Sequence, residues 1–169
     1  MKIAIIGAGN IGGNVPWGAL PTALAQMGPL ADKLVIDTTN QFGAGPKPAD
    51  GQTAAAFNAA RMPGARYTKS FNTLTAAFQV EAADRPVERQ VVQWICGDDP
   101  GATAVVASLV EEAGYVPVDL GGTAGAPVME APRRAGAVYG EEYRRADARA
   151  VVEAVRTGTP IPATPRYDS

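Results

Sequence analysis

The sequence predicts an α/β protein with a mostly parallel sheet and crossover helices. Short apolar runs rich in β-branched residues alternate along the chain with segments of helical period. A glycine-rich turn directly follows the first of these runs. The chain has 169 residues, of which 46% are hydrophobic and 19% are charged, as expected for one globular domain and not for a disordered tail or a coiled-coil rod.

Five apolar runs are the predicted strands. The run from Ile3 to Ile6 is short and continuous, which is typical of a buried strand in a parallel sheet. Similar runs cover residues 34–36, 91–96 and 115–118, and a weaker one covers 66–71. Because Pro117 has no N–H to donate to a ladder, we expect the run that contains it at a sheet edge.

Four segments carry helical signals. Asp99 and Pro100 form a typical helix start, and the apolar face that follows predicts a helix over 101–113. A second helix is expected over 141–156, with Glu141 and Arg145 paired on its surface. Shorter helices are expected over 20–27 and 51–60. Residues 1–157 are therefore expected to form a single domain, followed by a Pro-rich tail, 158–169, that is extended or mobile.

Composition excludes several classes of function. A net charge of −2 leaves no basic footprint for nucleic acid. The chain has no histidine and one cysteine, so we expect neither a metal site nor a histidine base, and Cys96, inside an apolar run, is expected to be a buried, inert thiol. No run approaches the roughly 20 apolar residues of a membrane span, and the first is too short for a secretory signal. We expect no membrane association and a cytoplasmic location.

The glycine-rich turn fits the dinucleotide-binding pattern G-x-G-x-x-G at Gly7, Gly9 and Gly12. In that pattern glycines let backbone N–H groups approach a pyrophosphate at a helix N-terminus. The position directly after a strand favours this function over an ordinary glycine turn. The expected helix does not follow, because Gly13, Pro16 and Gly18 prevent a regular one.

Asp37 follows the second predicted strand, where a dinucleotide-binding domain keeps the acid that binds the ribose. Too little chain precedes it for a full helical crossover. A cap of the strand or of the next loop is therefore the simpler interpretation.

Five ordered blocks resemble the family of NADPH-dependent reductases of the deazaflavin coenzyme F-420. They are residues 3–12, 15–21, 33–40, 69–73 and 96–99. The resemblance extends over most of residues 1–140. It implies a Rossmann-like oxidoreductase that transfers a hydride between NADP(H) and coenzyme F-420 or another deazaflavin or flavin-type coenzyme, as a homodimer.

The chain departs from the family after the glycine-rich turn. Family members place about two further helix–strand units, roughly fifty residues, between that turn and the Val-Pro-Trp-Gly segment at 15–18. Here the two are joined near Gly13. The loop in which the family selects the 2′-phosphate of NADP is lost with them. Residues 1–157 are thus predicted to be a truncated dinucleotide-binding-type domain.

The resemblance implies a set of coenzyme-binding residues, and no catalytic residue, because hydride transfer mainly requires two aligned rings. Trp17 could equally cover exposed core. Lys69 and Asn72 lie on opposite faces of the predicted strand unless it stops near Ser70, and a solvated lysine is the simpler interpretation of Lys69. The implied residues are Gly7, Gly9, Asn10, Ile11, Gly12, Pro16, Trp17, Asn40 and Asn72.

Gly121, Gly122 and Thr123 offer closely spaced N–H groups for a second coenzyme, the deazaflavin or flavin. Thr123 and Pro127 stand where the family commonly has Leu and Arg, which weakens the attraction for an anionic coenzyme. Asp98 and Asp99 form a pair of carboxylates, for which helix capping by Asp99 is the simpler interpretation.

A second hypothesis is a degenerate, non-catalytic Rossmann-like module that acts through dimerisation or partner binding. It is motivated by the lost crossover, which removes the helix terminus that would face the pyrophosphate. Strands without their usual neighbours are also expected to lower stability or cause aggregation. A third possibility, that the junction at residues 12–14 is an artefact of the encoding sequence, is tested by resequencing the gene there.

Overall fold

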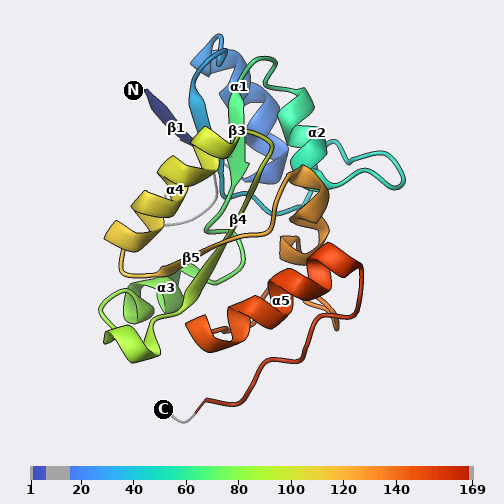
Figure 1. The fold of residues 1–169 in the computed structure, drawn as a ribbon. Coiled ribbons are helices and arrows are strands. Elements are labelled where there is room, and N and C mark those ends of the chain that lie inside the picture. Colours follow the sequence, from blue (N-terminus) through green and yellow to red (C-terminus); the bar gives the residue numbers. More distant parts are fainter. Residues whose placement is uncertain (1, 7–15, 168–169) are drawn as a thin grey trace.

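The computed structural model describes residues 2–6 and 16–167, and these form an α/β fold with a central sheet (Figure 1). Its strand order is β1-β2-β3-β4-β5. All five strands coincide with predicted apolar runs, and Pro117 lies in the strand at one end of the sheet, as predicted. The strands are β1 (Ile3–Ile6), β2 (Leu34–Asp37), β3 (Arg66–Lys69), β4 (Val92–Gly97) and β5 (Val116–Asp119).

Three of the four strand pairings are parallel, and each has its own crossover helix. The helix α1 (Leu20–Met27) connects β1 to β2, α2 (Ala54–Ala60) connects β2 to β3, and α4 (Pro100–Glu112) connects β4 to β5. The fourth pairing, β3 with β4, is antiparallel and is connected through α3 (Ala76–Ala82). The mostly parallel, Rossmann-like class is confirmed.

β1 pairs directly with β2. The register places Ile3 opposite Leu34 and Ile6 opposite Asp37. β1 lies at the end of the sheet, so its outer edge has no strand partner within the described residues. Ile3 and Ile5 point to one face of this edge strand and remain 39% and 45% exposed.

Two apolar cores cover the two faces of the sheet. On one face, Val35 and Trp94 pack with residues of α1, α2, the 3₁₀ segment η3 (Thr123–Met129) and α5 (Arg145–Thr157). On the other, Leu34 and Ile36 pack with residues of α3 and α4. Figure 1 shows α4 on one side of the sheet and α1 and α2 on the other. Successive residues of β2 thus face opposite cores and all of them are buried, as a sheet covered on both faces requires.

Helix starts follow local capping. Asp99 caps α4 by accepting hydrogen bonds from the N–H groups of Gly101, at 2.8 Å, and Ala102, at 3.0 Å, as predicted. α1 has the predicted bounds. α2 begins at Ala54, later than predicted, because the Thr53 side chain caps it.

The last helix begins at Arg145, not at 141 as predicted. Glu141 pairs with Arg133 at 2.7 Å instead of with Arg145. Tyr143 is buried, and its carbonyl accepts a hydrogen bond from the N–H of Val92 at 2.8 Å, which holds this segment against β4 in an extended form. The segment from Gly158 to Tyr167 has no regular secondary structure, and the hydroxyl of Tyr143 donates to the carbonyl of Pro162 at 2.9 Å.

Candidate functional site

A cavity of about 280 Å³ lies where β2 and β3 end. Ligands of open α/β sheets bind in the crevice outside the carboxyl ends of the strands, so its position is that of a binding site. Four predicted coenzyme-binding residues, Pro16, Trp17, Asn40 and Asn72, line it together. We name it the strand-end pocket; its lining is Pro16, Trp17, Thr38, Asn40, Phe42, Phe71, Asn72, Leu74, Thr75, Ala76 and Gln79.

Trp17 forms one wall of the strand-end pocket and is also part of the core. It opens the 3₁₀ turn η1 (Trp17–Ala19) that leads into α1. Its side chain is 2% exposed, stacks on Phe57 with ring centroids 5.9 Å apart, and donates its indole N–H to the carbonyl of Pro46 at 2.8 Å. Trp17 therefore covers core and also lines the cavity, and its contact with a coenzyme stays a prediction.

Asn40 and Asn72 join the loops after β2 and β3. The side-chain amide of Asn40 donates to the carbonyl of Asn72 at 2.7 Å. The amide of Asn72 donates to Asn40 Oδ1 at 3.1 Å and to the carbonyl of Met129 at 2.7 Å. β3 stops at Lys69, and Phe71 has a φ of 58°, so the chain turns sharply between them. That turn, which strand alternation does not predict, brings Asn72 to the cavity.

Two buried oxygens of the lining residues have no hydrogen-bond partner. They are Thr38 Oγ1 and Asn72 Oδ1, in side chains that belong to residues 5% and 3% exposed. Most buried polar atoms in proteins are paired, and an unpaired one costs about 1–3 kcal/mol. Both atoms are buried, so their missing partners mark an unsatisfied spot in the interior beside the pocket.

Asp37 lies at the centre of a buried polar network beside the pocket. Its carboxylate accepts from the N–H and hydroxyl of Thr39 at 2.8 and 2.7 Å, from Asn58 at 2.9 Å and from the hydroxyl of Tyr67 at 2.5 Å. The ammonium of Lys69 is 3.5 Å away and donates to the carbonyl of Thr39 at 2.7 Å. Asp37 therefore holds the loop that leads to Asn40, as a cap, and its carboxylate is fully buried.

The charges in this network are mutually stabilised. Burial alone would raise the pKa of Asp37, but the charge of Lys69 and hydrogen bonds from Asn58, Tyr67 and Thr39 together hold that pKa below its ordinary value. Burial, with the nearby charge of Asp37, raises the pKa of Tyr67 well above its ordinary value. Lys69 is fully buried, so the interpretation as a solvated strand-end lysine is wrong.

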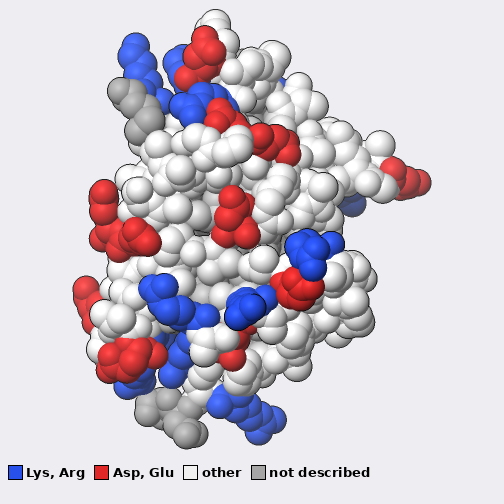
Figure 2. Space-filling model, viewed as in Figure 1, with Lys and Arg blue, Asp and Glu red and all other residues white. Residues whose placement is uncertain are grey.

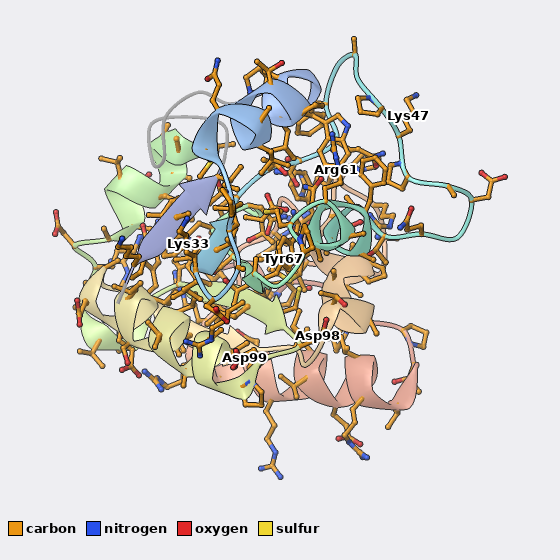
Figure 3. All side chains as sticks on the ribbon, turned by 90° about the horizontal axis from the view of Figure 1, so that it is seen from above. Lys33, Lys47, Arg61, Tyr67, Asp98 and Asp99 are labelled. Carbon is orange, nitrogen blue, oxygen red and sulfur yellow. The ribbon has the colours of Figure 1, made fainter. Side chains whose placement is uncertain are left out.

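The loop predicted to seat a second coenzyme is held by carboxylates of the protein. The Asp98 carboxylate accepts from the N–H and the hydroxyl of Thr123, both at 2.9 Å, and Asp119 accepts from the N–H of Gly121 at 2.8 Å. Figure 3 shows Asp98 beside Asp99 near the start of α4. Gly121, Gly122 and Thr123 are not among the residues lining the strand-end pocket. A second coenzyme at this loop stays a prediction.

The glycine-rich turn lies outside the described residues, so Gly7, Gly9, Asn10, Ile11 and Gly12 stay predictions. The residues that flank this segment, Ile6 before it and Pro16 after it, both lie beside the pocket. The carbonyl of Ile6 accepts a hydrogen bond from the N–H of Thr38 at 2.7 Å, and Pro16 is part of the pocket lining.

Sequence reasoning missed the other lining residues of the pocket, which are Thr38, Phe42, Phe71, Leu74, Thr75, Ala76 and Gln79. Thr38 directly follows β2, so the rule that ligands bind beyond strand ends could have found it. Phe42 and Gln79 carry no such signal, since one lies in a loop and the other on a helix that apolar periodicity does not show.

The described residues contain neither a metal-binding cluster nor a membrane-spanning helix. Residues 2–6 and 16–167 contain no group of three or more His, Cys, Asp and Glu side chains placed to hold a metal. None of their helices combines the length and apolar character needed to cross a membrane.

Burial raises the pKa of the Cys96 thiol to about 12, as expected for an inert cysteine. Figure 2 shows acidic and basic side chains interspersed over the face in view.

Comparisons with known proteins support the fold and indicate a class of function. No family model matches the chain. A solved structure of a hypothetical protein from Sinorhizobium meliloti superimposes with a TM-score of 0.70 at 23% identity, over 84% of this chain and 67% of that one. That likeness shows a shared fold. A proposed F-420-dependent NADP reductase from Arthrobacter sp. is 28% identical over 62% of this chain and 49% of that one, but its TM-score of 0.48 is too low to support a shared fold.

In sequence, the chain is 31% identical over 102 residues to Metalloreductase STEAP3 of Rattus norvegicus. This match covers 60% of the chain but 20% of the rat protein's length. The chain therefore spans about a fifth of the curated relative it matches. The chain is thus a Rossmann-like α/β protein with a cavity at the carboxyl ends of two strands, and it is similar over part of its length to a metalloreductase.

Proposed function

We propose that the chain binds NADP(H) and acts as an NADP-dependent oxidoreductase, with the nicotinamide end of the coenzyme in the strand-end pocket. The observation that carries this proposal is the convergence of Pro16, Trp17, Asn40 and Asn72 in that pocket. They come from three separate segments of the chain, and all four are residues that the resemblance implies for coenzyme binding. The partial similarity to a metalloreductase supports the reaction class.

The lining fits the nicotinamide end in size and in chemistry. About 280 Å³ is just below the roughly 300–1,000 Å³ of pockets for drug-sized ligands, so the cavity suits a ring and the atoms next to it and is too small for a dinucleotide. Trp17, Phe71 and Leu74 supply apolar walls, and the lining also includes polar residues such as Asn40 and Asn72. None of its described lining residues is ionisable.

The rest of the coenzyme would extend toward the glycine-rich turn. Gly7 follows Ile6 in the chain, and Ile6 is hydrogen-bonded to Thr38 of the pocket. In the pattern G-x-G-x-x-G such glycines bring N–H groups close to a pyrophosphate. Gly7, Gly9, Asn10, Ile11 and Gly12 would therefore contact the phosphates.

The residues of the chain act by position and not by acid–base chemistry. When bound, NADPH supplies a hydride from its reduced ring to an acceptor, which takes up one proton from solvent as it is reduced. Trp17 and the Asn40–Asn72 pair would fix the plane of the ring, and the apolar walls would keep water from it. The acceptor is a deazaflavin such as coenzyme F-420, or a flavin, which the resemblance implies.

The test is NADPH oxidation, followed by its absorbance, with a deazaflavin, with FMN and without an acceptor. We expect oxidation that depends on the deazaflavin or on FMN. Asn40→Ala removes both hydrogen bonds that Asn40 makes with Asn72, so it should raise KM for NADPH, while Gln26→Ala, on the exposed side of α1, should leave KM unchanged. Rates with the deazaflavin and with FMN that do not exceed the rate without an acceptor would overturn the reaction.

One observation favours the second hypothesis, a non-catalytic module that acts through dimerisation. β1 has no strand partner on its outer edge within the described residues, and Ile3 and Ile5 are exposed beside that edge. Such edges pair readily with other chains. Ile5→Lys should reduce self-association in analytical ultracentrifugation if this edge is the interface. Self-association without any coenzyme binding would favour the module over the enzyme.

A further inference from the structure

We propose that two neighbouring aromatic side chains at the rim of the strand-end pocket, Phe42 and Tyr139, bind the flat ring of the electron acceptor. This inference rests on the proposed function and adds to it the site at which the acceptor binds. The two ring centroids are 6.3 Å apart, and the ring planes are inclined at 58°. We name these two residues the rim pair.

Phe42 belongs to the pocket and is also open to solvent. It is a lining residue, yet it remains 57% exposed. Single exposed apolar side chains are common on proteins, but this one lies beside both a cavity and a second aromatic ring. A flat apolar ring placed against Phe42 would remove this surface from water, which favours binding. Because the surface is exposed, a ligand can reach it.

Tyr139 adds a polar group next to the apolar ring of Phe42. Its side chain is half-buried, and burial alone raises the pKa of its hydroxyl, with no hydrogen bond contributing. The hydroxyl therefore keeps its proton near neutral pH and can donate. Flavin and deazaflavin rings have an apolar face and carbonyl oxygens along one edge. They therefore match an aromatic face that lies beside a hydroxyl donor.

Backbone hydrogen bonds hold both members of the rim pair against the pocket. The N–H of Phe42 donates to the carbonyl of Asn40 at 2.8 Å, and Asn40 also lines the pocket. The residue after Tyr139, Gly140, donates its N–H to the carbonyl of Thr73 at 2.8 Å. Thr73 directly follows a lining residue in the chain. Both aromatic residues are thus held next to the loops after β2 and β3 that form the pocket.

The position of the rim pair favours the acceptor over the remainder of the coenzyme. Hydride transfer requires the two reacting rings to lie next to each other, and the nicotinamide end is proposed to fill the strand-end pocket. The rest of the coenzyme is proposed to extend toward the glycine-rich turn. Because the rim is exposed, an acceptor bound there can enter and leave, and it can take up its proton from solvent.

The rim pair differs from the loop predicted to seat a second coenzyme. In that loop the N–H groups of Gly121 and Thr123 are already engaged by Asp119 and Asp98. The rim pair carries no charge near neutral pH, so it would contact the ring of the acceptor and not a phosphate. Riboflavin, which has the ring without the phosphate, should therefore bind with an affinity similar to that of FMN.

The chain offers variants that remove the rim pair in steps. Tyr139→Phe removes only the hydroxyl, Tyr139→Ala removes the ring, and Phe42→Ala removes the exposed apolar side chain. Val87→Ala is the control, because Val87 is 70% exposed and does not line the pocket. Substitutions at exposed positions usually change stability little, so Phe42→Ala and Val87→Ala should melt close to the wild type. Tyr139→Phe keeps the packing of the half-buried ring and should do the same.

Riboflavin and FMN are the probes, because stacking on an aromatic side chain quenches flavin fluorescence. We expect both to bind the wild type with similar affinity and with quenching. Phe42→Ala and Tyr139→Ala should weaken binding about tenfold, Tyr139→Phe about threefold, and Val87→Ala not at all. Calorimetric titration with NADPH should give the same affinity for Tyr139→Phe as for the wild type, since Tyr139 does not line the pocket.

Other outcomes separate this inference from the proposed function. If the wild type binds NADPH but not riboflavin, or if Phe42→Ala and Tyr139→Ala bind riboflavin as tightly as the wild type, the inference is overturned and NADP(H) binding stands. Weaker NADPH binding by Tyr139→Phe, with riboflavin binding unchanged, would assign the rim pair to the coenzyme and overturn the inference as well. Riboflavin binding that depends on the rim pair, without NADPH binding, would overturn the proposed function and support the ring site.

Discussion

Thr38 donates its backbone N–H to the carbonyl oxygen of Ile6 at 2.7 Å, so the last residue of β1 lies beside the first residue after β2. Gly7, the start of the glycine-rich turn, is the next residue after Ile6. The end of β1, after which the sequence continues into the glycine-rich turn, therefore lies at the same edge of the sheet as the strand-end pocket. This juxtaposition is the structural basis of the proposed coenzyme site.

Trp17 should report coenzyme binding through its fluorescence. It lines the pocket, whereas the other tryptophan, Trp94, is buried against Tyr143 with ring centroids 5.4 Å apart. We expect NADPH to quench the emission of Trp17 in the wild type and in Trp94→Phe, and to have little effect on Trp17→Phe. Trp17→Phe also loses the hydrogen bond to Pro46 and should reduce stability by about 0.5–1.5 kcal/mol. Equal quenching in Trp17→Phe and Trp94→Phe would contradict this assignment.

Removing one charge of the buried Asp37–Lys69 pair should strongly lower the free energy of unfolding. Lys69→Met leaves an uncompensated carboxylate in the interior and should lower the free energy of unfolding by about 3–5 kcal/mol in urea denaturation. Asp37→Asn with Lys69→Met removes both charges and should recover part of that loss. If the loss of unfolding free energy in the double variant equals the sum of the losses in Lys69→Met and in Asp37→Asn, the two charges do not interact. Glu153→Gln, which breaks an exposed pair with Arg156, is the control and should have little effect.

Asp99 should contribute to loss of stability in acid. A hydrogen bond from Arg66, with others from the start of α4, lowers the pKa of Asp99 from 3.8 to about 2 in the folded chain. Because the folded pKa lies below the unfolded one, the stabilisation is complete above pH 3.8 and is lost as pH falls toward 2. Asp99→Asn keeps a capping side chain and should flatten the pH dependence of unfolding over this interval. The shift of Asp37 has the same direction, so some slope should remain. An unchanged slope would contradict the role of the Arg66 contact.

Cys96 should be unreactive in the folded protein. Burial raises the pKa of its thiol to about 12, so the thiolate that reacts with thiol reagents is scarce near neutral pH. We expect no labelling by a disulfide reagent at pH 8 in the native state and complete labelling of the one cysteine in urea, both followed by absorbance. Rapid labelling of the native protein would contradict this burial.

Apolar patterning was sufficient for the framework of the fold. The five strands and the helix after Asp99 are indicated by continuous or periodic apolar residues, which is the signal that burial imposes on a sequence. α3 could not be predicted in this way, because it has seven residues and its buried side includes the polar Gln79. The burial of Lys69 also escaped prediction, since it depends on a partner, Asp37, that is remote in the chain and comes alongside only when β2 and β3 pair.

The site was partly predictable for a different reason. Asn40 and Asn72 came from a resemblance to a family, not from patterning, and the turn at Phe71 that brings them together is a backbone feature that strand alternation does not reveal. Thr38 could have been predicted as a lining residue, because it directly follows a strand whose end faces the crevice. Phe42 and Gln79 required the folded chain.

Calorimetric titration of the full chain with NADPH, with NADH for comparison, tests the central claim most directly. We predict saturable binding of one NADPH per chain at micromolar concentrations. Equal binding of NADH would retain a nicotinamide-binding oxidoreductase but remove the preference for NADP. No heat at millimolar concentrations of either coenzyme would contradict the assignment of the strand-end pocket to nicotinamide.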